Sequence, residues 1–293
     1  MRRFKRGVLT MFFKTNTVCV YGGTGRYGSY HLKRMIEYGT NVVCVVSKNK
    51  HIQRMDGVPV YQSLSESFEK PDTAVFFVPP QNVLEAFKDA VDNGVVNFVI
   101  ITEHVPVHDT LKMLKLAREK GATIVGPNCP GVINPHERVK VGIMPEKYFK
   151  AGNVAIISRS GTLMYETAKH LSENPGVGVA LGLGGDPVVG TNVSEAFEIV
   201  KKLGYEKVLL IGEIGGEDEV RGVEHALKIG FSPENIVAFF AGRHAPEGKR
   251  MGHAGAIIEG ERGKVSFKEQ RLKELGVKVV KFPWEVKDAW RIW

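Results

Sequence analysis

The amino-acid sequence predicts an α/β protein with two doubly wound domains. Nine short apolar runs rich in valine and isoleucine recur along the 293 residues. Their hydrophobicity is continuous rather than alternating, which is typical of parallel strands covered by helices on both faces. Segments between several of these runs have the apolar spacing of helices and end on glycine. A stretch rich in proline and glycine near residues 127–152 divides the chain into two series of such units.

The first half of the chain starts with a strand, a glycine-containing loop and a helix. The strand is TVCVY (17–21), the loop is GGTGRYG (22–28), and the helix is expected over SYHLKRMIEYG. Two later segments, LEAFKDAVDNG and TLKMLKLAREKG, place apolar residues on one face and end on glycine, which predicts a helix for each. The remaining strands expected in this half are 41–46, 73–78, 98–102 and 122–126.

The second half opens in the same way. Strand NVAIIS (153–158) is followed by the short loop SRSG and by a helix expected over TLMYETAKHL. Further buried strands are expected at 207–212, 235–240 and 277–282. With right-handed crossovers, both halves give doubly wound sheets.

The domain boundary falls in a stretch without sustained periodicity. PNCPGVINPHERVKVGIMPEKYFKAG contains four prolines and no regular apolar spacing. We therefore expect a first domain at 12–130, a linker at 131–151 and a second domain at 152–293. Residues 1–11 are basic and lack the apolar core of a secretory signal, so they are expected to be a disordered N-terminal extension.

Composition and charge exclude several classes of protein. Hydrophobic residues make up 43% of the chain, and no apolar run approaches the length of a membrane span, so no membrane association is expected. The three cysteines are scattered without CxxC spacing, which predicts a reducing compartment and a cytoplasmic location. The net charge of +8 is carried by residues 1–150, about half of it by Arg2, Arg3, Lys5 and Arg6. The modest positive excess that remains in the first domain suits a polyanionic ligand. The basic residues are not interleaved with aromatic ones, so nucleic-acid binding is not expected.

The first glycine loop has the pattern of a phosphate-binding turn. Residues 23–28 read GxGxxG between a strand and a helix, where glycines allow close approach to phosphate and the helix start offers N–H donors. An NAD site would need an acid after the second strand, but the chain has Lys48 and Lys50 there. Two lysines favour a phosphorylated ribose, as in NADP or coenzyme A. Each lysine taken alone is better explained as a solvated loop charge.

The second loop, SRSG, presents Ser158, Ser160 and Gly161 at the start of a helix. Serine is a preferred N-cap residue, and a cap and an anion site use the same N–H groups, so both interpretations are compatible. The loop lacks the GxSxG pattern of a serine hydrolase, which makes that class of enzyme a poor fit.

A glutamate and a histidine are candidates for the chemistry of the second half. Glu213 follows strand 207–212 at the edge where open α/β sheets bind ligands, and its carboxylate would hold one ring nitrogen of a histidine. His253 lies in GKRMGHAGAII between small residues, which suits a covalent phosphoryl carrier or a structural histidine on a glycine turn. It has no partners at metal-ligand spacing, so no metal site is expected. The acids at 217–219 are interpreted only as the first turn of a helix.

Six motifs, taken together, resemble one family. GGTGRYG, GPNCPG, SRSGTL, GLGGDP, GEIGG and GKRMGHAGAII resemble the α subunits of the succinyl-CoA synthetases (succinate–CoA ligases), within the nucleoside-diphosphate-forming acyl-CoA synthetases. The resemblance runs from about residue 12 to the C-terminus. It implies a Rossmann-like coenzyme A-binding domain followed by a flavodoxin-like ligase domain. It also implies that His253 is a phosphohistidine and that Glu213 orients it.

The resemblance implies binding residues as well. It places Tyr165 at the substrate-binding junction with another subunit, and a phosphate site at Ser158, Ser160 and Gly161. The coenzyme A contacts that it implies are Thr24, Gly25, Arg26, Tyr27, Lys50, Ile101, Thr102 and Glu103.

The activity implied by the resemblance is reversible formation of succinyl-CoA from succinate, coenzyme A and ATP or GTP, a step of the tricarboxylic acid cycle. The nucleotide and its Mg²⁺ would be bound mainly by a β subunit, in an αβ or α2β2 assembly, and the sequence contains no Walker loop. Three alternatives stay open: a related synthetase for another acid, an NADP-dependent reductase, and a coenzyme A-binding regulatory protein without turnover.

Overall fold

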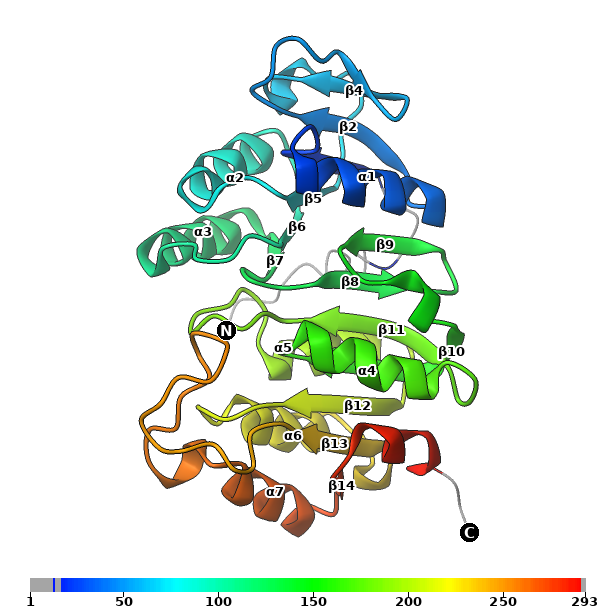
Figure 1. The fold of residues 1–293 in the computed structure, drawn as a ribbon, viewed down its shortest axis with the longest axis vertical. Helices are drawn as coiled ribbons and strands as arrows, with labels where there is room; N and C mark the ends of the chain where they lie inside the picture. The colour runs from blue at the N-terminus through cyan, green and yellow to red at the C-terminus, as the bar shows by residue number, and fades with distance from the viewer. Residues whose placement is uncertain (1–12, 14–16, 291–293) are drawn as a thin grey trace. The chain divides into compact units, whose positions relative to one another are not determined.

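The computed structural model describes residues 13 and 17–290, so the N-terminal extension expected at 1–11 lies outside the described residues. The chain divides into two compact units. The first contains Met1–Met144 and Val188–Gly190, and the second contains Pro145–Pro187 and Thr191–Trp293. Each unit has a largely parallel sheet flanked by helices, which confirms the predicted α/β class (Figure 1).

The sheet of the first unit has the strand order β3-β4-β2-β1-β5-β6-β7. Its neighbouring strands are parallel except for β3 and β4. Four of the strands, β1, β5, β6 and β7, are buried at every position, which explains why their sequences are largely apolar. The strands are β1 (Val18–Tyr21), β2 (Val42–Val46), β3 (Arg54–Met55), β4 (Val58–Tyr61), β5 (Thr73–Phe76), β6 (Asn97–Ile100) and β7 (Thr123–Val125), and the unit also has a hairpin of β8 (Gly131–Asn134) and β9 (Val139–Gly142).

Three helices cover the sheet of the first unit: α1 (Arg26–Tyr38), α2 (Val83–Asp92) and α3 (Val107–Lys120). The chain moves from β1 to β2 in one direction and from β5 to β7 in the other. Right-handed crossovers therefore put α1 on the opposite face from α2 and α3 (Figure 1). Cys19 and Cys44 are partners across β1 and β2, and all three cysteines of the chain are buried free thiols.

Within the second unit, five parallel strands are ordered β14-β13-β12-β10-β11. The chain moves from β10 to β11 in one direction and from β11 through β12 to β14 in the other, so α4 lies on one face and α5, α6 and α7 lie on the other. The elements are β10 (Ala151–Ser158), α4 (Gly161–Leu171), β11 (Val177–Gly182), α5 (Val193–Lys202), β12 (Lys207–Gly212), α6 (Asp218–Lys228), β13 (Ile236–Phe240), α7 (Val265–Glu274) and β14 (Lys278–Val280).

Five strands of the structure are not predicted by the sequence. β11 was missed because Gly178 and Gly182 dilute its apolar run, although Gly178 is needed to make room for the ring of Tyr205. β3 and β4 are short, and β4 contains Pro59. β8 and β9 lie in the stretch expected to be a linker at 131–151, where they form a tight antiparallel hairpin.

In each sheet, two neighbouring strands are followed by connections that run in opposite directions along the sheet. These strands are β1 and β5 in the first unit and β10 and β12 in the second. Open α/β sheets bind ligands at the carboxyl ends of such strands. The loops that follow these four strands therefore carry the candidate sites.

Candidate functional sites

The loop after β1 is shaped by glycines. Gly22 has φ +80°, and a Cβ there would lie 2.9 Å from the carbonyl oxygen of Phe77. A Cβ on Gly28, in the first turn of α1, would overlap the carbonyl oxygen of Gly22. The helix can sit on this turn only because both positions lack a side chain. α1 begins after Gly25 without a side-chain cap, so its first N–H groups face the loop, as in phosphate-binding turns.

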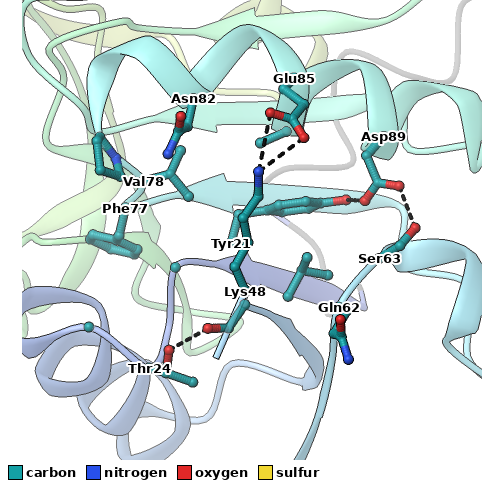
Figure 2. A pocket seen from close by; sticks show the side chains of 16 residues that line it. Tyr21, Thr24, Lys48, Gln62, Ser63, Phe77, Val78, Asn82, Glu85 and Asp89 are labelled. Carbon is teal, nitrogen blue, oxygen red and sulfur yellow. Dashed lines mark hydrogen bonds and ion pairs between the residues drawn. The ribbon is translucent and has the colours of Figure 1, made fainter. Parts of the chain in front are cut away.

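A cavity of about 520 Å³ opens beside this loop, at the carboxyl ends of β1, β2 and β5 (Figure 2). This volume is in the usual range for small-molecule sites. The end of β5 contributes Phe77, Val78 and Pro79 to its lining. Of the residues expected to contact coenzyme A, Thr24 and Gly25 line the cavity, and Thr24 is hydrogen-bonded to Ser47 at 2.5 Å.

Tyr21, Ser63 and Asp89 form a hydrogen-bonded group in the cavity wall that the sequence did not suggest (Figure 2). The hydroxyls of Tyr21 and Ser63 each donate to a different carboxylate oxygen of Asp89, both at 2.7 Å. Burial raises the pKa of Tyr21 well above its usual value, so its hydroxyl stays protonated and donates. Because both oxygens of Asp89 already accept hydrogen bonds, this carboxylate supports the wall rather than offering an empty acceptor for a ribose.

Lys48 reaches from the end of β2 to α2. Its Nζ lies 3.1 Å and 3.3 Å from the two carboxylate oxygens of Glu85 (Figure 2). Both side chains line the cavity and are mostly exposed, so the ion pair is weak and an anionic ligand can compete with Glu85. Lys50 lies in the turn that follows β2 and is not part of this lining. Of the two lysines noted in the sequence, the structure therefore brings Lys48 to the cavity.

The segment Ile101–Thr102–Glu103 follows β6 and lies outside the lining of the cavity, but one of its residues contacts that lining. Thr102 Oγ1 donates a 2.8 Å hydrogen bond to the carbonyl oxygen of Val78, which lines the cavity. Glu103 is exposed, with its carboxylate 3.9 Å from the His104 ring. The segment therefore supports the cavity wall from the neighbouring strand end.

Arg26 and Tyr27 lie outside the lining of the main cavity. They line a second cavity of about 500 Å³ together with Tyr30 and His31. The His31 ring stacks on Phe77 with centroids 5.7 Å apart. Burial, with a smaller effect of Lys140, lowers the pKa of His31 from 6.5 to about 4, so this imidazole is neutral at pH 7.

In the second unit, the structure brings Glu213 and His253 together. Glu213 directly follows β12, and its Oε2 lies 2.8 Å from Nδ1 of His253. The carboxylate is nearly buried, whereas the imidazole is 28% exposed. When the ionised carboxylate accepts this hydrogen bond, Nδ1 carries the hydrogen and Nε2 carries the lone pair. The pair thus has the geometry of a nucleophile and its orienting group.

Glycine backbone holds the loop around His253. The N–H of Gly255 donates to the carbonyl oxygen of Gly185 at 3.0 Å, and a Cβ on Gly185 would overlap the imidazole ring. A Cβ on Gly255 would lie 3.1 Å from Nη2 of Arg159. The glycines of GLGGDP and GHAGA therefore let the backbone approach the ring and the guanidinium closely.

Arg159 is a residue of this site that the sequence analysis did not single out. Its Nε lies 3.6 Å from Oε1 of Glu213, and its Nη2 donates to the carbonyl oxygen of Asp186 at 3.0 Å. Arg159 Nε and Glu213 Oε1 are buried and have no hydrogen-bond partner among the described residues. The carboxylate of Glu213 therefore lies between an imidazole and a guanidinium. The signal in the sequence was the position of Arg159 within SRSG, directly after a strand.

The hydroxyls of Ser158 and Ser160 are used within their own loop. Ser158 Oγ donates to the carbonyl oxygen of Ser160 at 2.8 Å and accepts from its N–H at 3.1 Å. Ser160 is the N-cap of α4, because its Oγ accepts from the N–H of Leu163 at 3.4 Å. Gly161 is the first residue of α4, at the positive end of the helix dipole. An anion at this helix start would therefore be met mainly by backbone N–H groups.

Tyr165 lies one turn into α4, on the helix that begins at the SRSG loop. Its half-buried ring packs edge-to-face on Phe149, with centroids 6.4 Å apart. Tyr165 therefore belongs to the same helix that begins at the SRSG loop, one turn further along.

The described part of the chain contains neither a cluster of metal-ligating side chains nor a helix that could span a membrane. Within residues 13 and 17–290, no group of three or more His, Cys, Asp or Glu side chains is arranged to hold a metal ion. Over the same residues, no helix has both the length and the apolar character needed to cross a bilayer.

One family model matches residues in the first half of the chain, and a second family model matches residues in the second half. The family model described as CoA binding domain matches residues 13–104, and the model described as CoA-ligase matches residues 157–278. The first contains the glycine loop and its cavity, and the second contains Glu213 and His253. A chain with both domains is a CoA ligase.

Full-length relatives then define the family. A succinate–CoA ligase [ADP-forming] subunit alpha 2 of Archaeoglobus fulgidus is 43% identical over 275 residues, which cover 92% of this chain and 94% of the relative. The corresponding alpha subunit of Methanothermobacter thermautotrophicus is 42% identical over 293 residues, 98% of each chain. This protein belongs to the family of succinate–CoA ligase α subunits, which confirms the resemblance seen in the six motifs. Family membership argues against the NADP-dependent reductase and the coenzyme A-binding protein without turnover.

Solved structures share the fold at low sequence identity. An ATP citrate lyase of Methanosaeta concilii superposes with a TM-score of 0.83 at 21% identity, over 96% of this chain and 50% of the other. A dinucleotide-forming acetyl-coenzyme A synthetase 1 of Ca. Korarchaeum cryptofilum has a TM-score of 0.76 at 23% identity, over 96% of this chain and 61% of the other. This chain thus spans about half to three fifths of these larger proteins.

Proposed function

We propose that the chain is the α subunit of a succinate–CoA ligase that forms succinyl-CoA reversibly from succinate, coenzyme A and ATP or GTP through a phosphohistidine at His253. The 2.8 Å contact between His253 Nδ1 and Glu213 Oε2 carries this proposal. The names of the relatives, succinate–CoA ligase [ADP-forming] subunit alpha, support the acid and the nucleoside diphosphate product. In this role the chain acts in the tricarboxylic acid cycle, in the cytoplasm.

The two phosphoryl transfers of the reaction use the orientation of His253. Glu213 accepts the Nδ1–H, so Nε2 attacks the terminal phosphorus of the nucleotide, the phosphorus–oxygen bond breaks and the nucleoside diphosphate leaves. An oxygen of succinate then attacks this phosphorus, the phosphorus–nitrogen bond breaks and His253 is regenerated. The thiolate sulfur of coenzyme A attacks the acyl carbon, and inorganic phosphate leaves. Splitting the ligation in this way replaces one difficult step with three easier ones.

The binding residues follow from the same proposal. The start of α4, with Ser158, Ser160 and Gly161, holds the phosphoryl group through backbone N–H groups that need no reorganisation. Tyr165, on the same helix, lies at the substrate-binding junction with the partner subunit.

Coenzyme A binds at the glycine loop and the cavity beside it. Its contacts are Thr24, Gly25, Arg26, Tyr27, Lys50, Ile101, Thr102 and Glu103, and Lys48 is added because it lines the cavity. The glycine-shaped turn, the uncapped start of α1 and the basic first half of the chain fit an anionic ligand.

A β subunit completes the enzyme, in an αβ or α2β2 assembly. The relatives are named as alpha subunits, and the sequence contains no Walker loop. The β subunit would therefore supply most of the site for ATP or GTP and its Mg²⁺, which neutralises charge on the phosphates during transfer.

The test is phosphorylation of the intact enzyme. The α chain with its β subunit, Mg²⁺ and γ-labelled ATP or GTP should give a protein-bound label that is stable in base and lost in acid. His253→Ala should abolish the label, whereas His170→Ala, which removes a half-buried histidine in the last turn of α4, should leave it unchanged. Label that persists in His253→Ala would refute the proposal.

A further inference from the structure

The second unit contains an ion pair that is fully excluded from water. Lys268 belongs to α7 and Glu219 to the first turn of α6, and both side chains are 0% exposed. Lys268 Nζ lies 2.6 Å from Oε2 of Glu219. The sequence predicts that Glu219 belongs to the first turn of a helix, and the structure confirms this; the burial of its side chain is a further finding.

The remaining bonds of this pair go to the backbone around Glu213. Lys268 Nζ donates to the carbonyl oxygens of Glu213 and Gly215, at 2.8 Å and 2.7 Å. Glu219 Oε1 accepts from the N–H of Glu213 at 3.3 Å. The N–H and the carbonyl of Glu213 are thus both held by the same ion pair, and all three hydrogens of the ammonium group have an acceptor.

The Glu213–Gly215 backbone, which the ion pair holds, also lies against the segment that follows His253. A Cβ on Gly215 would lie 2.5 Å from the carbonyl oxygen of Gly255 and 2.8 Å from that of Ile257. A small shift of the Glu213–Gly215 backbone would therefore change the distance between the Glu213 carboxylate and His253.

Stability alone does not explain such a pair. Removing two charges from water costs several kcal/mol per ion, and well-packed apolar residues of the same volume often stabilise a protein equally well or better. Groups that orient a reactive side chain need a fixed geometry, which a fully hydrogen-bonded ion pair supplies.

We propose that Lys268 and Glu219 are positioning residues for the reaction. Their buried ion pair fixes the backbone of Glu213, so that its carboxylate meets Nδ1 of His253 and leaves Nε2 as the nucleophile. This inference rests on the proposed phosphohistidine function and deepens it.

The experiment removes the charges while keeping the volume. In Glu219→Leu/Lys268→Met, assembled with the β subunit, we expect the initial rate of His253 phosphorylation to fall by about 10- to 100-fold, as for other residues that orient a reactive group. The ¹⁵N NMR spectrum of histidine-labelled chain should shift from the Nδ1–H form toward a mixture of tautomers. Glu219→Gln, which keeps the shape of the side chain, is the second variant and should show both changes to a smaller extent.

The chain offers a matched control between the same two helices. Arg271 of α7 and Glu224 of α6 form an ion pair at 2.9 Å that is partly exposed. Glu224→Leu/Arg271→Met should lower neither the phosphorylation rate nor the Nδ1–H population.

Two results would overturn the inference. One is a wild-type rate and tautomer in Glu219→Leu/Lys268→Met, or in Glu219→Gln if the double variant does not fold. The other is an equal loss in the Arg271–Glu224 control, which would indicate a general effect on helix packing. Failure of the proposed function would look different, because His253 of the wild-type chain would not be phosphorylated while the tautomer measurement would still report on the ion pair.

Discussion

His253 depends on a neighbour that has no side chain. The carbonyl oxygen of Gly185 anchors the histidine loop through the N–H of Gly255, and the same glycine leaves the space that the imidazole occupies. The imidazole ring is thus held on one edge by the Glu213 carboxylate and lies on another edge against the backbone of Gly185. Small changes of shape here would therefore act on the nitrogen that we propose to carry the phosphoryl group.

Gly185→Ala should therefore impair catalysis more than folding. The added Cβ would overlap the imidazole and push it away from Glu213. Because a displacement of about 1 Å can cost about 100-fold in rate, we expect a loss of that size in His253 phosphorylation, measured as initial rate of labelling. Gly263→Ala is the control, since its Cβ would lie 3.5 Å from Gly215, an ordinary contact. A wild-type rate in Gly185→Ala would contradict the close fit.

His31 makes the stability of the chain depend on pH. Its pKa is lowered from 6.5 to about 4. Between these values the unfolded chain binds a proton that the native chain does not, so the free energy of unfolding falls as the pH drops through this window and is retained above it. His31→Phe keeps a ring beside Phe77 but does not titrate. This variant should lose less stability than the wild type between about pH 7 and pH 4.5 in chemical denaturation, and an equal loss would show that His31 is not responsible.

Single residues were predictable from sequence where a motif marked them. Glu213 and His253 could be named because one follows a strand and the other lies among glycines. Lys268 could not, because it stands in KVSFKEQRLKE among other lysines that look solvated. Nothing local indicates that this lysine alone is buried, since its acceptors lie about fifty residues away in the chain.

At the scale of elements, two helix starts in the second unit are capped differently. α5 has a capping box, in which Asn192 Oδ1 accepts from the N–H of Glu195 at 2.9 Å and Glu195 Oε2 accepts from the N–H of Asn192 at 3.0 Å. In α4 the contact from the N–H of Leu163 to Ser160 Oγ is longer, at 3.4 Å, and the N–H of Ser160 donates to Ser158 Oγ at 3.1 Å rather than to a residue of the helix. The tightly capped start stabilises the fold, and the weaker cap of α4 fits the phosphate site that we propose at its N–H groups.

Asn192→Ala should therefore affect stability without affecting activity. Loss of an N-cap of this type costs about 1 kcal/mol of unfolding free energy. Denaturant unfolding should show this decrease, while the rate of His253 phosphorylation stays at the wild-type level. Asn192→Ser, which can still cap, should recover most of the stability. An unchanged unfolding free energy in Asn192→Ala would mean that the cap contributes nothing.

The strands show what local pattern can predict. The nine runs of valine and isoleucine each overlap a strand of the structure, because burial on both faces removes polar alternation. β11 and the β8–β9 hairpin were missed because glycine and proline in their sequences indicate a loop. Their glycines meet tertiary constraints instead, as where a Cβ on Gly131 would overlap the carbonyl oxygen of Val141.

At the scale of the whole molecule, charge is divided between the two halves of the chain. The first half carries the full net charge of +8, whereas residues 151–293 are neutral. A basic surface raises the local concentration of an anionic ligand, and salt screens this effect. The half with the glycine loop is thus the one suited to attract a polyanion.

Binding of coenzyme A should accordingly depend on ionic strength. Raising the salt from about 0.1 M to about 1 M shortens the Debye length from about 10 Å to about 3 Å, so we expect the Kd to rise several-fold. Calorimetric titration would measure it, and dephospho-coenzyme A, which has fewer charges, should show a smaller change. A Kd that is independent of salt for both ligands would show that the charge of the first half does not contribute.

The buried thiols have a practical consequence for assays. Cys19, Cys44 and Cys129 are at most 4% exposed, so reagents that modify sulfhydryl groups have little access to the folded protein. In an assay mixture, the accessible sulfhydryl group would then be that of coenzyme A rather than one of the cysteines of this chain. A chromogenic disulfide could then follow continuously the release of that sulfhydryl from succinyl-CoA in the reverse direction of the proposed reaction, and a slow rise in background colour without substrate would report unfolding of the chain.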